Sequence, residues 1–249
     1  MKDEIIKIEN FIKEYVANAN AKGVIIGMSG GKDSLICAKL CCEALGKENV
    51  LGILMPNGAN KDLNIAIDSC KELDIRHHII DINSVYTPLI SKVENILTQE
   101  NTKITDISTI NTPPRLRMTT LYAIAGSLNY LVVNTSNLSE AMIGYTTKWG
   151  DDVGDFSPIG NYTKSEVCNI GLELGLRKDL VLKTPDDGLS GISDEEKIGF
   201  TYEELDNYIR NGIKGKNFDK IARMHRISQH KRNIISKCPN NFNNYFDNK

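Results

Sequence analysis

Residues 24–34 read VIIGMSGGKDS and place glycines, hydroxyls, a lysine and an aspartate within one short stretch. Paired glycines let a backbone turn tightly and bring its amide groups close to an anion, which is typical of a phosphate-binding loop. The commonest such loop has four residues between its glycines and a Ser or Thr after its lysine. Here only three residues separate Gly27 from Gly31, and Asp33 follows Lys32. The stretch therefore predicts a phosphate site of a different kind.

Asp33 sets this loop apart, because a carboxylate next to a polyphosphate is repelled unless a divalent cation lies between them. In the first turn of a following helix the carboxylate itself is stable, and the helix N-terminus favours an anion at the same point. Carboxylate and phosphate oxygens together suit Mg²⁺. The alternative is an ordinary glycine turn in which Asp33 only begins a helix. It is disfavoured because the loop lies between an apolar β-branched run and an apolar helical pattern.

The elements that must position the loop alternate along the chain between short apolar runs and amphipathic segments. Short β-branched runs bounded by turn residues predict strands at 23–28, 50–55, 77–82 and 130–137. Apolar residues at helical spacing predict helices over 5–16, from 33 onward, and over 61–73, 164–175, 202–211 and 217–233. Because strands that alternate with helices form βαβ units, the predicted fold is α/β, with a doubly wound, mostly parallel sheet flanked by helices.

The pair Thr112-Pro113 is typical of a helix start, with the threonine as N-cap and the proline in the first turn. A helix is therefore expected from Pro113 onward, after a polar break between Thr98 and Thr112. Its core-facing stripe is predicted to consist of Met118, Leu121, Tyr122, Ala125 and Leu128.

The chain has 249 residues, of which 41% are hydrophobic and 25% are charged, and it is predicted to form a single domain over 1–249. A chain of this size buries roughly 70–75% of its unfolded surface, so it needs no disulfide or structural metal. The cysteines contain no C-x-x-C pair, and Cys37 and Cys41 lie four residues apart in an apolar helical pattern. They are expected to be buried, reduced thiols.

The formal net charge is −2 and the sequence pI is about 6.1, so no general basic field favours nucleic acid as a partner. The first residues lack the apolar core of a signal peptide, and no apolar run approaches the length of a membrane span. We therefore expect no membrane partner and a cytoplasmic location.

Several polar residues beyond the loop could take part in binding. Thr135 closes the fourth predicted strand, where ligands of open α/β sheets gather. Glu140 could be a second oxygen ligand for Mg²⁺ or a solvent-facing helix acid. A loop as long as 146–163 is more often functional than filler. Arg115 or Arg117 alone would be a solvated cation, and His230-Lys231 could simply complement a helix dipole.

The loop resembles the PP-loop of ATP pyrophosphatases, enzymes that adenylate an acceptor oxygen and release pyrophosphate. A more specific block, T-x-x-x-x-E-x-x-x-G-x-x-T-K-x-G-D, runs from Thr135 to Asp151. With the segments NTPPRLRM, KTPDDGLSG and SQHKR, this block is similar to ammonia-dependent NAD synthetases over most of the chain.

The resemblance implies a Rossmann-like fold of the adenine nucleotide alpha hydrolase type, with ATP as co-substrate and Mg²⁺ as cofactor. It implies that Asp33 and Glu140 hold the metal and that Asp33 and Lys164 are catalytic. The implied ATP-binding residues are Gly27, Met28, Ser29, Gly30, Gly31, Lys32, Asp33, Ser34, Thr135, Lys164 and Asp186. The implied deamido-NAD-binding residues are Arg115, Lys148, Asp155, His230 and Lys231.

Three positions depart from the family pattern. Lys32 fills a loop position that is often uncharged, Pro113-Pro114 replaces the more usual Lys-Ala before Arg115, and Asp186 stands where Ser or Thr is common. The assignment of Asp186 to ATP is the one that this comparison weakens most.

The resemblance also implies a reaction and an assembly. The carboxylate of deamido-NAD would attack the α-phosphorus of ATP, and ammonia would then displace AMP to give NAD, with the loop 146–163 as a lid. A homodimer is expected, without a glutaminase domain, so the nitrogen donor is free or transferred ammonia. Two alternatives stay open: a PP-loop enzyme that modifies tRNA, and a nucleotide sensor that does not turn over.

Overall fold

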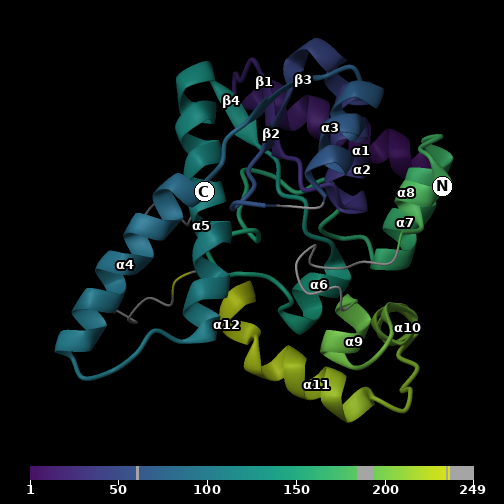
Figure 1. Cartoon of the computed structure of the whole chain (residues 1–249). Coiled ribbons are helices and arrows are strands. Elements are labelled where there is room, and N and C mark those ends of the chain that lie inside the picture. The colour runs from purple at the N-terminus through teal and green to yellow at the C-terminus, as the bar shows by residue number, and fades with distance from the viewer. Residues whose placement is uncertain (60–61, 184–192, 234, 236–249) are drawn as a thin grey trace, which may run out of the picture.

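The centre of the molecule is a sheet of four parallel strands, seen in the computed structural model, which describes residues 1–59, 62–183, 193–233 and 235 (Figure 1). The strands are β1 (Gly23–Gly27), β2 (Val50–Leu54), β3 (Arg76–Ile79) and β4 (Tyr130–Val132). Their order is β3-β2-β1-β4, with Val24 beside Val50 on one side and Leu131 on the other. The chain thus extends the sheet outward from β1 and then returns to its other edge, which confirms the predicted doubly wound α/β fold.

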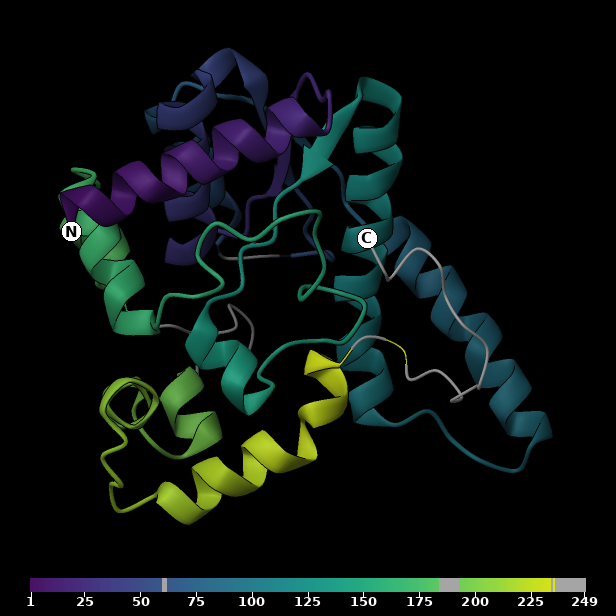
Figure 2. The same ribbon diagram turned by 180° about the vertical axis from the view of Figure 1, so that it is seen from behind.

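Helices cover both faces of the sheet. Val24 and Ile26 face a layer formed by α1 (Lys2–Asn18), α2 (Lys32–Leu45), α3 (Leu63–Glu72) and α7 (Lys164–Glu173). Ile25 and Val132 face α5 (Asp106–Leu128) on the other side. Figure 2 shows α1 nearest the viewer, where it packs along α2. Because both faces are buried at β1 and β2, these strands read as continuous apolar runs, whereas the edge strand β3 has the sequence RHHI and is largely exposed.

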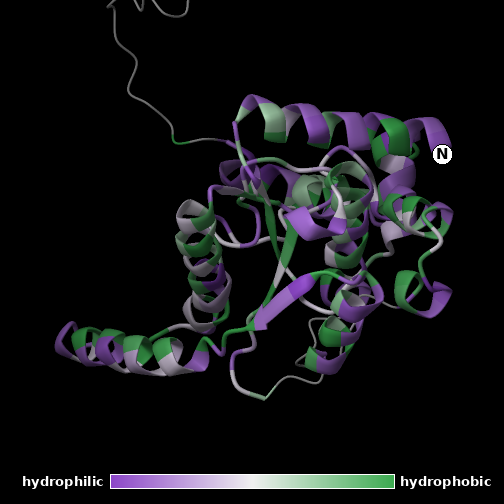
Figure 3. Cartoon of the chain, turned by 90° about the horizontal axis from the view of Figure 1, so that it is seen from above, coloured by the Kyte–Doolittle hydropathy of each residue, from purple (hydrophilic) through white to green (hydrophobic). Residues whose placement is uncertain are grey.

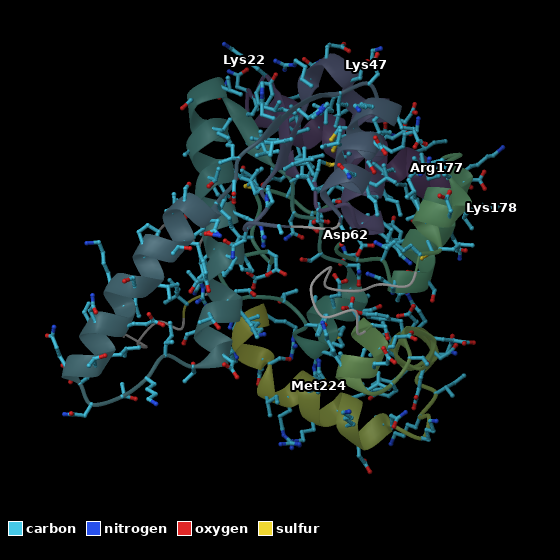
Figure 4. All side chains as sticks on the ribbon, in the orientation of Figure 1. Lys22, Lys47, Asp62, Arg177, Lys178 and Met224 are labelled. Carbon is cyan, nitrogen blue, oxygen red and sulfur yellow. The ribbon has the colours of Figure 1, made fainter. Side chains whose placement is uncertain are left out.

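A second group of helices lies beyond the carboxyl ends of the strands (Figure 1). Its members are α6 (Leu138–Ile143), α9 (Asp194–Ile198), α10 (Tyr202–Asn211), α11 (Phe218–Ile227) and α12 (Gln229–Arg232). Figure 4 shows this arrangement, with Lys22 and Lys47 at one end of the molecule, Met224 of α11 at the other, and Asp62 between them. A separate apolar cluster around Ile198, Phe200 and Leu205 holds the group together. Outside this group lie α4 (Asn83–Gln99), α8 (Lys178–Val181) and the 3₁₀ turn η1 (Lys47–Asn49).

The helix expected to start at Thr112-Pro113 begins earlier, so that prediction is wrong. Its N-cap is Thr105, whose side chain accepts a hydrogen bond from Ser108 N, and Pro113-Pro114 lies in the helix interior. Pro113 has no N–H to donate to the carbonyl of Thr109 one turn earlier. The hydroxyl of Tyr86, from α4, donates to that carbonyl at 3.4 Å instead. A tertiary contact thus satisfies the group that the proline leaves unpaired.

Other boundaries differ by smaller amounts. The third strand lies at Arg76–Ile79 instead of 77–82, and the helix predicted over 217–233 is divided at Ser228. Leu128, predicted to face the core, is 40% exposed. It occupies the last turn of α5, which ends directly before β4 at the edge of the sheet. In the first helix, the helical spacing predicts a buried stripe of Ile5, Ile8, Ile12, Tyr15 and Val16; all are buried except Tyr15, which is 39% exposed.

The cysteines behave as expected in the part of the chain that the structure describes. Cys37 and Cys41 are free and buried, and burial raises the pKa of both thiols. Their prediction as buried, reduced thiols is confirmed. Within the described ranges, no helix has the length and apolar character needed to cross a membrane.

Candidate active site

A cavity of about 450 Å³ opens at the carboxyl ends of β1 and β4. Ligands of open α/β sheets bind at this point, because the loops after the two strands run in opposite directions where the strand order reverses and leave a crevice between them. The whole predicted loop from Gly27 to Ser34 lines the cavity, together with Thr135, Glu140 and Lys164. Asp186, the remaining predicted ATP residue, lies outside the described residues.

The backbone of the loop turns at Gly30, whose φ is +84°. A Cβ at this position would lie 2.7 Å from the carbonyl oxygen of Asp62, so a side chain is excluded both by conformation and by space. Gly31 is the N-cap of α2, and its N–H donates to Ser29 Oγ at 3.1 Å. The hydroxyl of Ser34 donates back to the Gly31 carbonyl at 3.0 Å. The loop is therefore held in shape before any phosphate binds.

Three charged side chains meet beside the loop. Lys164 Nζ lies 2.7 Å from Asp33 Oδ2 and 2.9 Å from Glu140 Oε1, and the side chains are 7%, 16% and 14% exposed, respectively. Asn137 Nδ2 donates to the same oxygen of Asp33 at 3.3 Å. The three residues come from α7, α2 and α6, so helices far apart in sequence converge on one point. One ammonium between two carboxylates leaves the cluster with a formal charge of −1.

Two capping boxes aim this cluster. Asn137 caps α6: its side chain accepts from Glu140 N, while Glu140 Oε2 accepts from Asn137 N. Thr163 caps α7 in the same way with Glu166, which makes Lys164 the first residue of that helix. Glu140 is buried and paired, so the alternative of a solvent-facing helix acid is wrong.

Burial strongly affects the ionisation of this cluster. Burial, with the neighbouring charge of Asp33, raises the pKa of Glu140 to about 7, although Lys164 opposes the change. Burial by itself would lower the pKa of Lys164, but the carboxylates of Asp33 and Glu140 outweigh it and raise that pKa well above its usual value. Lys164 is therefore a permanent cation, whereas Glu140 titrates near neutrality.

The donor set fits Mg²⁺. Asp33 Oδ1 is buried and has no hydrogen-bond partner among the described residues, although a buried carboxylate oxygen normally has one. Glu140 supplies a second carboxylate across Lys164. No cluster of three or more His, Cys, Asp or Glu suited to a metal occurs in the described part of the chain. Mg²⁺ is commonly held by one or two carboxylates while phosphates and water complete its shell.

Three of the predicted dinucleotide residues are neighbours. Arg115 Nε donates to the carbonyl of Lys148 at 3.2 Å, and Lys148 Nζ donates to the carbonyl of His230. Lys148 Nζ also lies 5.2 Å from the ring centroid of Trp149. These cations are therefore satisfied by carbonyl oxygens and an aromatic face rather than by anions.

The other two predicted dinucleotide residues have separate surroundings. Lys231 Nζ donates to the carbonyls of Gly144 and Thr146 at 2.7 and 2.6 Å and lines a second cavity of about 200 Å³. Asp155 Oδ2 accepts from Val132 N at 2.7 Å, at the end of β4. None of the five predicted dinucleotide residues lines the larger cavity.

The larger cavity also contains residues that the sequence analysis missed. Lys183 Nζ lies 2.9 Å from Asp62 Oδ1, and Tyr145 donates to Asp194 Oδ1 at 3.0 Å. Lys183 is the first residue of the segment KTPDDGLSG, one of the segments that carry the family resemblance, but the resemblance did not single out this lysine. The described residues Asp62 and Asp194 had no motif to mark them.

Arg117 and Lys32 lie in the wall of the larger cavity, although the sequence left open whether either faces solvent. Arg117 is not a solvated cation: it lines the larger cavity, donates to the Met55 carbonyl at 2.9 Å, and has its pKa lowered by burial. Lys32 lines the same cavity, with Nζ 3.6 Å from Cys168 Sγ.

Comparison with known proteins gives a consistent result. The family model described as NAD synthase matches residues 4–241. The NH(3)-dependent NAD(+) synthetase of Carboxydothermus hydrogenoformans is 41% identical over 231 residues, which cover 92% of this chain and 93% of that protein. Among solved structures, the NMN synthetase of Francisella tularensis has a TM-score of 0.86 at 32% identity and covers 97% of this chain and 98% of its own. The NH3-dependent NAD synthetase of Campylobacter jejuni has a TM-score of 0.78 at 30% identity and covers 96% and 98%.

Proposed function

Because the chain belongs to the NAD synthase family, we propose that its larger cavity carries out the ATP-dependent amidation of deamido-NAD with ammonia. The enzyme is a ligase that forms a C–N bond and produces NAD, AMP and pyrophosphate, the last step of NAD biosynthesis. One observation carries the assignment to this cavity: Lys164 lies between Asp33 and Glu140 beside a glycine-rich loop, with one carboxylate oxygen unpartnered.

The first step is attack of the substrate carboxylate on the α-phosphorus of ATP, which breaks the bond to the β-phosphate and releases pyrophosphate. The loop amides and the N-terminus of α2 bind the departing phosphates. Asp33 and Glu140 would hold Mg²⁺, which when bound would neutralise part of the phosphate charge. Lys164 places its ammonium beside the loop, where it stabilises the phosphate on which negative charge develops.

In the second step ammonia attacks the activated carbonyl carbon, AMP departs, and the nitrogen loses its extra proton. Water must be excluded because it would hydrolyse the acyl adenylate. The loop 146–163 is held by several contacts: Thr147 N donates to Asp151 Oδ1 at 2.6 Å, and Asn134 Nδ2 and Ser136 Oγ each donate to the Asp151 carbonyl at 3.1 Å. Its closure as a lid stays a prediction. Protection of this loop from proteolysis by ATP and deamido-NAD together would support it.

A second copy of the chain is the proposed partner. Helix α4 has no buried residue, and Val85, Leu89 and Ile96 on it are exposed, as are Ile107 and Ile110 at the start of α5. Figure 3 shows α4 projecting from the body with hydrophobic positions along it. Helix α4 packs against α5 only through partly buried residues such as Tyr86 and Ile90 and leaves the rest of its apolar side chains exposed. An exposed apolar surface of this kind marks a protein interface.

A second substrate is favoured by one comparison, the high structural similarity to the NMN synthetase of Francisella tularensis. The same chemistry would then amidate a mononucleotide that carries a carboxylate in place of the amide. The ratio of kcat/KM for the dinucleotide and mononucleotide substrates decides between them.

The deciding experiment combines the protein with ATP, Mg²⁺, ammonium and deamido-NAD. NAD with equal amounts of AMP and pyrophosphate supports the proposal. Orthophosphate would indicate an ATPase, and the absence of product would favour the nucleotide sensor. Binding of tRNA that weakens steeply with salt would favour the tRNA-modifying alternative. The cytoplasmic location stays a prediction.

A further inference from the structure

Lys164 has a third neighbour besides its two carboxylates. Its Nζ lies 5.3 Å from the centroid of the Tyr202 ring, within the range of a cation–π contact. Tyr202 is 4% exposed and is the first residue of α10, where its N–H donates to Glu195 Oε1 at 2.7 Å. The ring is therefore fixed beside the ammonium by a helix that packs mainly against α6 and α7.

The same helix also holds the main chain of Lys164. Lys164 N donates to Ser139 Oγ at 2.9 Å, and Ser139 Oγ in turn donates to Asp206 Oδ1. Asp206 Oδ2 accepts from Ser165 N at 2.8 Å. Tyr202 and Asp206 lie four residues apart, so they share one face of α10. One helix face thus fixes both the backbone and the ammonium of Lys164.

A neutral ring has an advantage over a third carboxylate at this position. If Asp33 and Glu140 held a metal ion, their charges would no longer be available to the ammonium of Lys164, which is buried. An aromatic face attracts a cation through its quadrupole without adding a negative charge. It therefore neither repels phosphate nor competes for the metal.

We propose that the aromatic ring of Tyr202 is a positioning residue that holds the Lys164 ammonium at the phosphate loop during the reaction proposed above. The proposed role belongs to the ring face and not to the hydroxyl: Tyr202 OH has no hydrogen-bond partner among the described residues, so Tyr202→Phe removes no observed hydrogen bond. Tyr202→Phe should therefore keep kcat within about twofold, since it preserves the ring face.

The test rests on the proposed function and first requires that wild-type protein produce NAD, AMP and pyrophosphate. Position 202 is then replaced by phenylalanine and by its mono-, di- and trifluorinated analogues, which weaken the negative ring face in steps while nearly preserving shape. We expect kcat to fall at each step, by about tenfold across the whole series, which is equivalent to about 1.4 kcal/mol. The KM for deamido-NAD should change by less than about twofold, because the contact that the series weakens is with Lys164, in the nucleotide cavity.

The matched control is the same series at Phe200, which is 4% exposed in the same apolar cluster. It should leave kcat unchanged, and Tyr202→Leu should lose at least as much kcat as the trifluorinated ring. A flat series at 202, or a Tyr202→Phe variant as impaired as Tyr202→Leu, would overturn the inference. Wild-type protein that makes no NAD would overturn the proposed function, and this inference with it.

Discussion

The two halves of the proposed site differ in how far one chain completes them. The nucleotide half is a single cavity in which the loop 27–34, Glu140 and Lys164 are already in contact. In the dinucleotide half, Lys148 Nζ donates a hydrogen bond to the His230 carbonyl, and Asp155 accepts one from Val132 N at the end of β4. The comparison indicates that the phosphate machinery is preorganised, whereas the second substrate must displace internal contacts or use a neighbouring subunit.

The sharpest way to break this comparison is to disable the preorganised half alone. Asp33→Asn should lower kcat by about 10³-fold, because it would remove the proposed metal ligand and leave Lys164 with one carboxylate. Steady-state formation of NAD measures the loss, and circular dichroism checks that the fold is intact. Near-normal turnover in this variant would show that Asp33 does not hold the metal.

The second prediction concerns the role of a neighbouring subunit. Replacing Leu89 and Ile107 by Asp should produce a monomer, because a charged side chain does not fit an apolar interface. The monomer should bind Mg·ATP normally but bind deamido-NAD about 10²-fold more weakly, because the neighbouring subunit would no longer complete the dinucleotide half. Light scattering and calorimetry measure the two effects. The matched control is Ile213→Asp, at a residue that is 59% exposed on the α10–α11 connection. Unchanged dinucleotide binding by the monomer would place that site within one chain.

The third prediction separates the substrates within one subunit. Lys148→Met should raise the KM for deamido-NAD by about 30-fold while the affinity for ATP changes little, since a charge-assisted hydrogen bond contributes roughly 1.5–3 kcal/mol. Initial rates at varied concentrations of each substrate measure the split. Lys13→Met, at an exposed lysine of α1, is the control. Equal effects on both substrates would contradict the division of the site.

The smallest expected effect is a pH dependence confined to the nucleotide half. The pKa of Glu140 is raised to about 7 in the folded protein, so its proton stabilises the folded apoprotein at low pH, and this stabilisation is lost as pH rises through about 7. If Glu140 holds Mg²⁺ as proposed, only the ionised carboxylate binds Mg·ATP, so the affinity for Mg·ATP should fall about tenfold between pH 8 and pH 6. Calorimetry in two buffers should detect proton release at pH 6. A Glu140→Gln variant with the same pH profile as wild type would refute this origin.

The sequence predicted the local features of the molecule better than the contacts between distant ones. The strands and the loop follow from runs of neighbouring residues, and Glu140 and Lys164 were identified by family resemblance. No sequence motif marked Tyr202 or Asp194. Their places in the site depend on contacts with residues distant in sequence: Tyr202 with the ammonium of Lys164, and Asp194 with the hydroxyl of Tyr145.

Pro113-Pro114 shows the opposite failure, a strong local signal that a distant contact overrides. The pair is typical of a helix start, yet it lies inside α5. The hydroxyl of Tyr86, from another helix, reaches the carbonyl that the first proline leaves without a donor. A helix boundary of this kind depends on a neighbour that no pattern in the helix itself contains.

The two carboxylate oxygens of Glu140 make different contacts: Oε2 accepts a hydrogen bond from Asn137 N at the start of α6, and Oε1 forms an ion pair with Lys164 Nζ. Aspartate would be too short to reach both partners, and glutamine could serve the helix but not a cation. The same side chain therefore both caps a helix and pairs with the Lys164 ammonium. A designer who wished to strengthen either contact would find this position already committed and would have to work elsewhere in the fold.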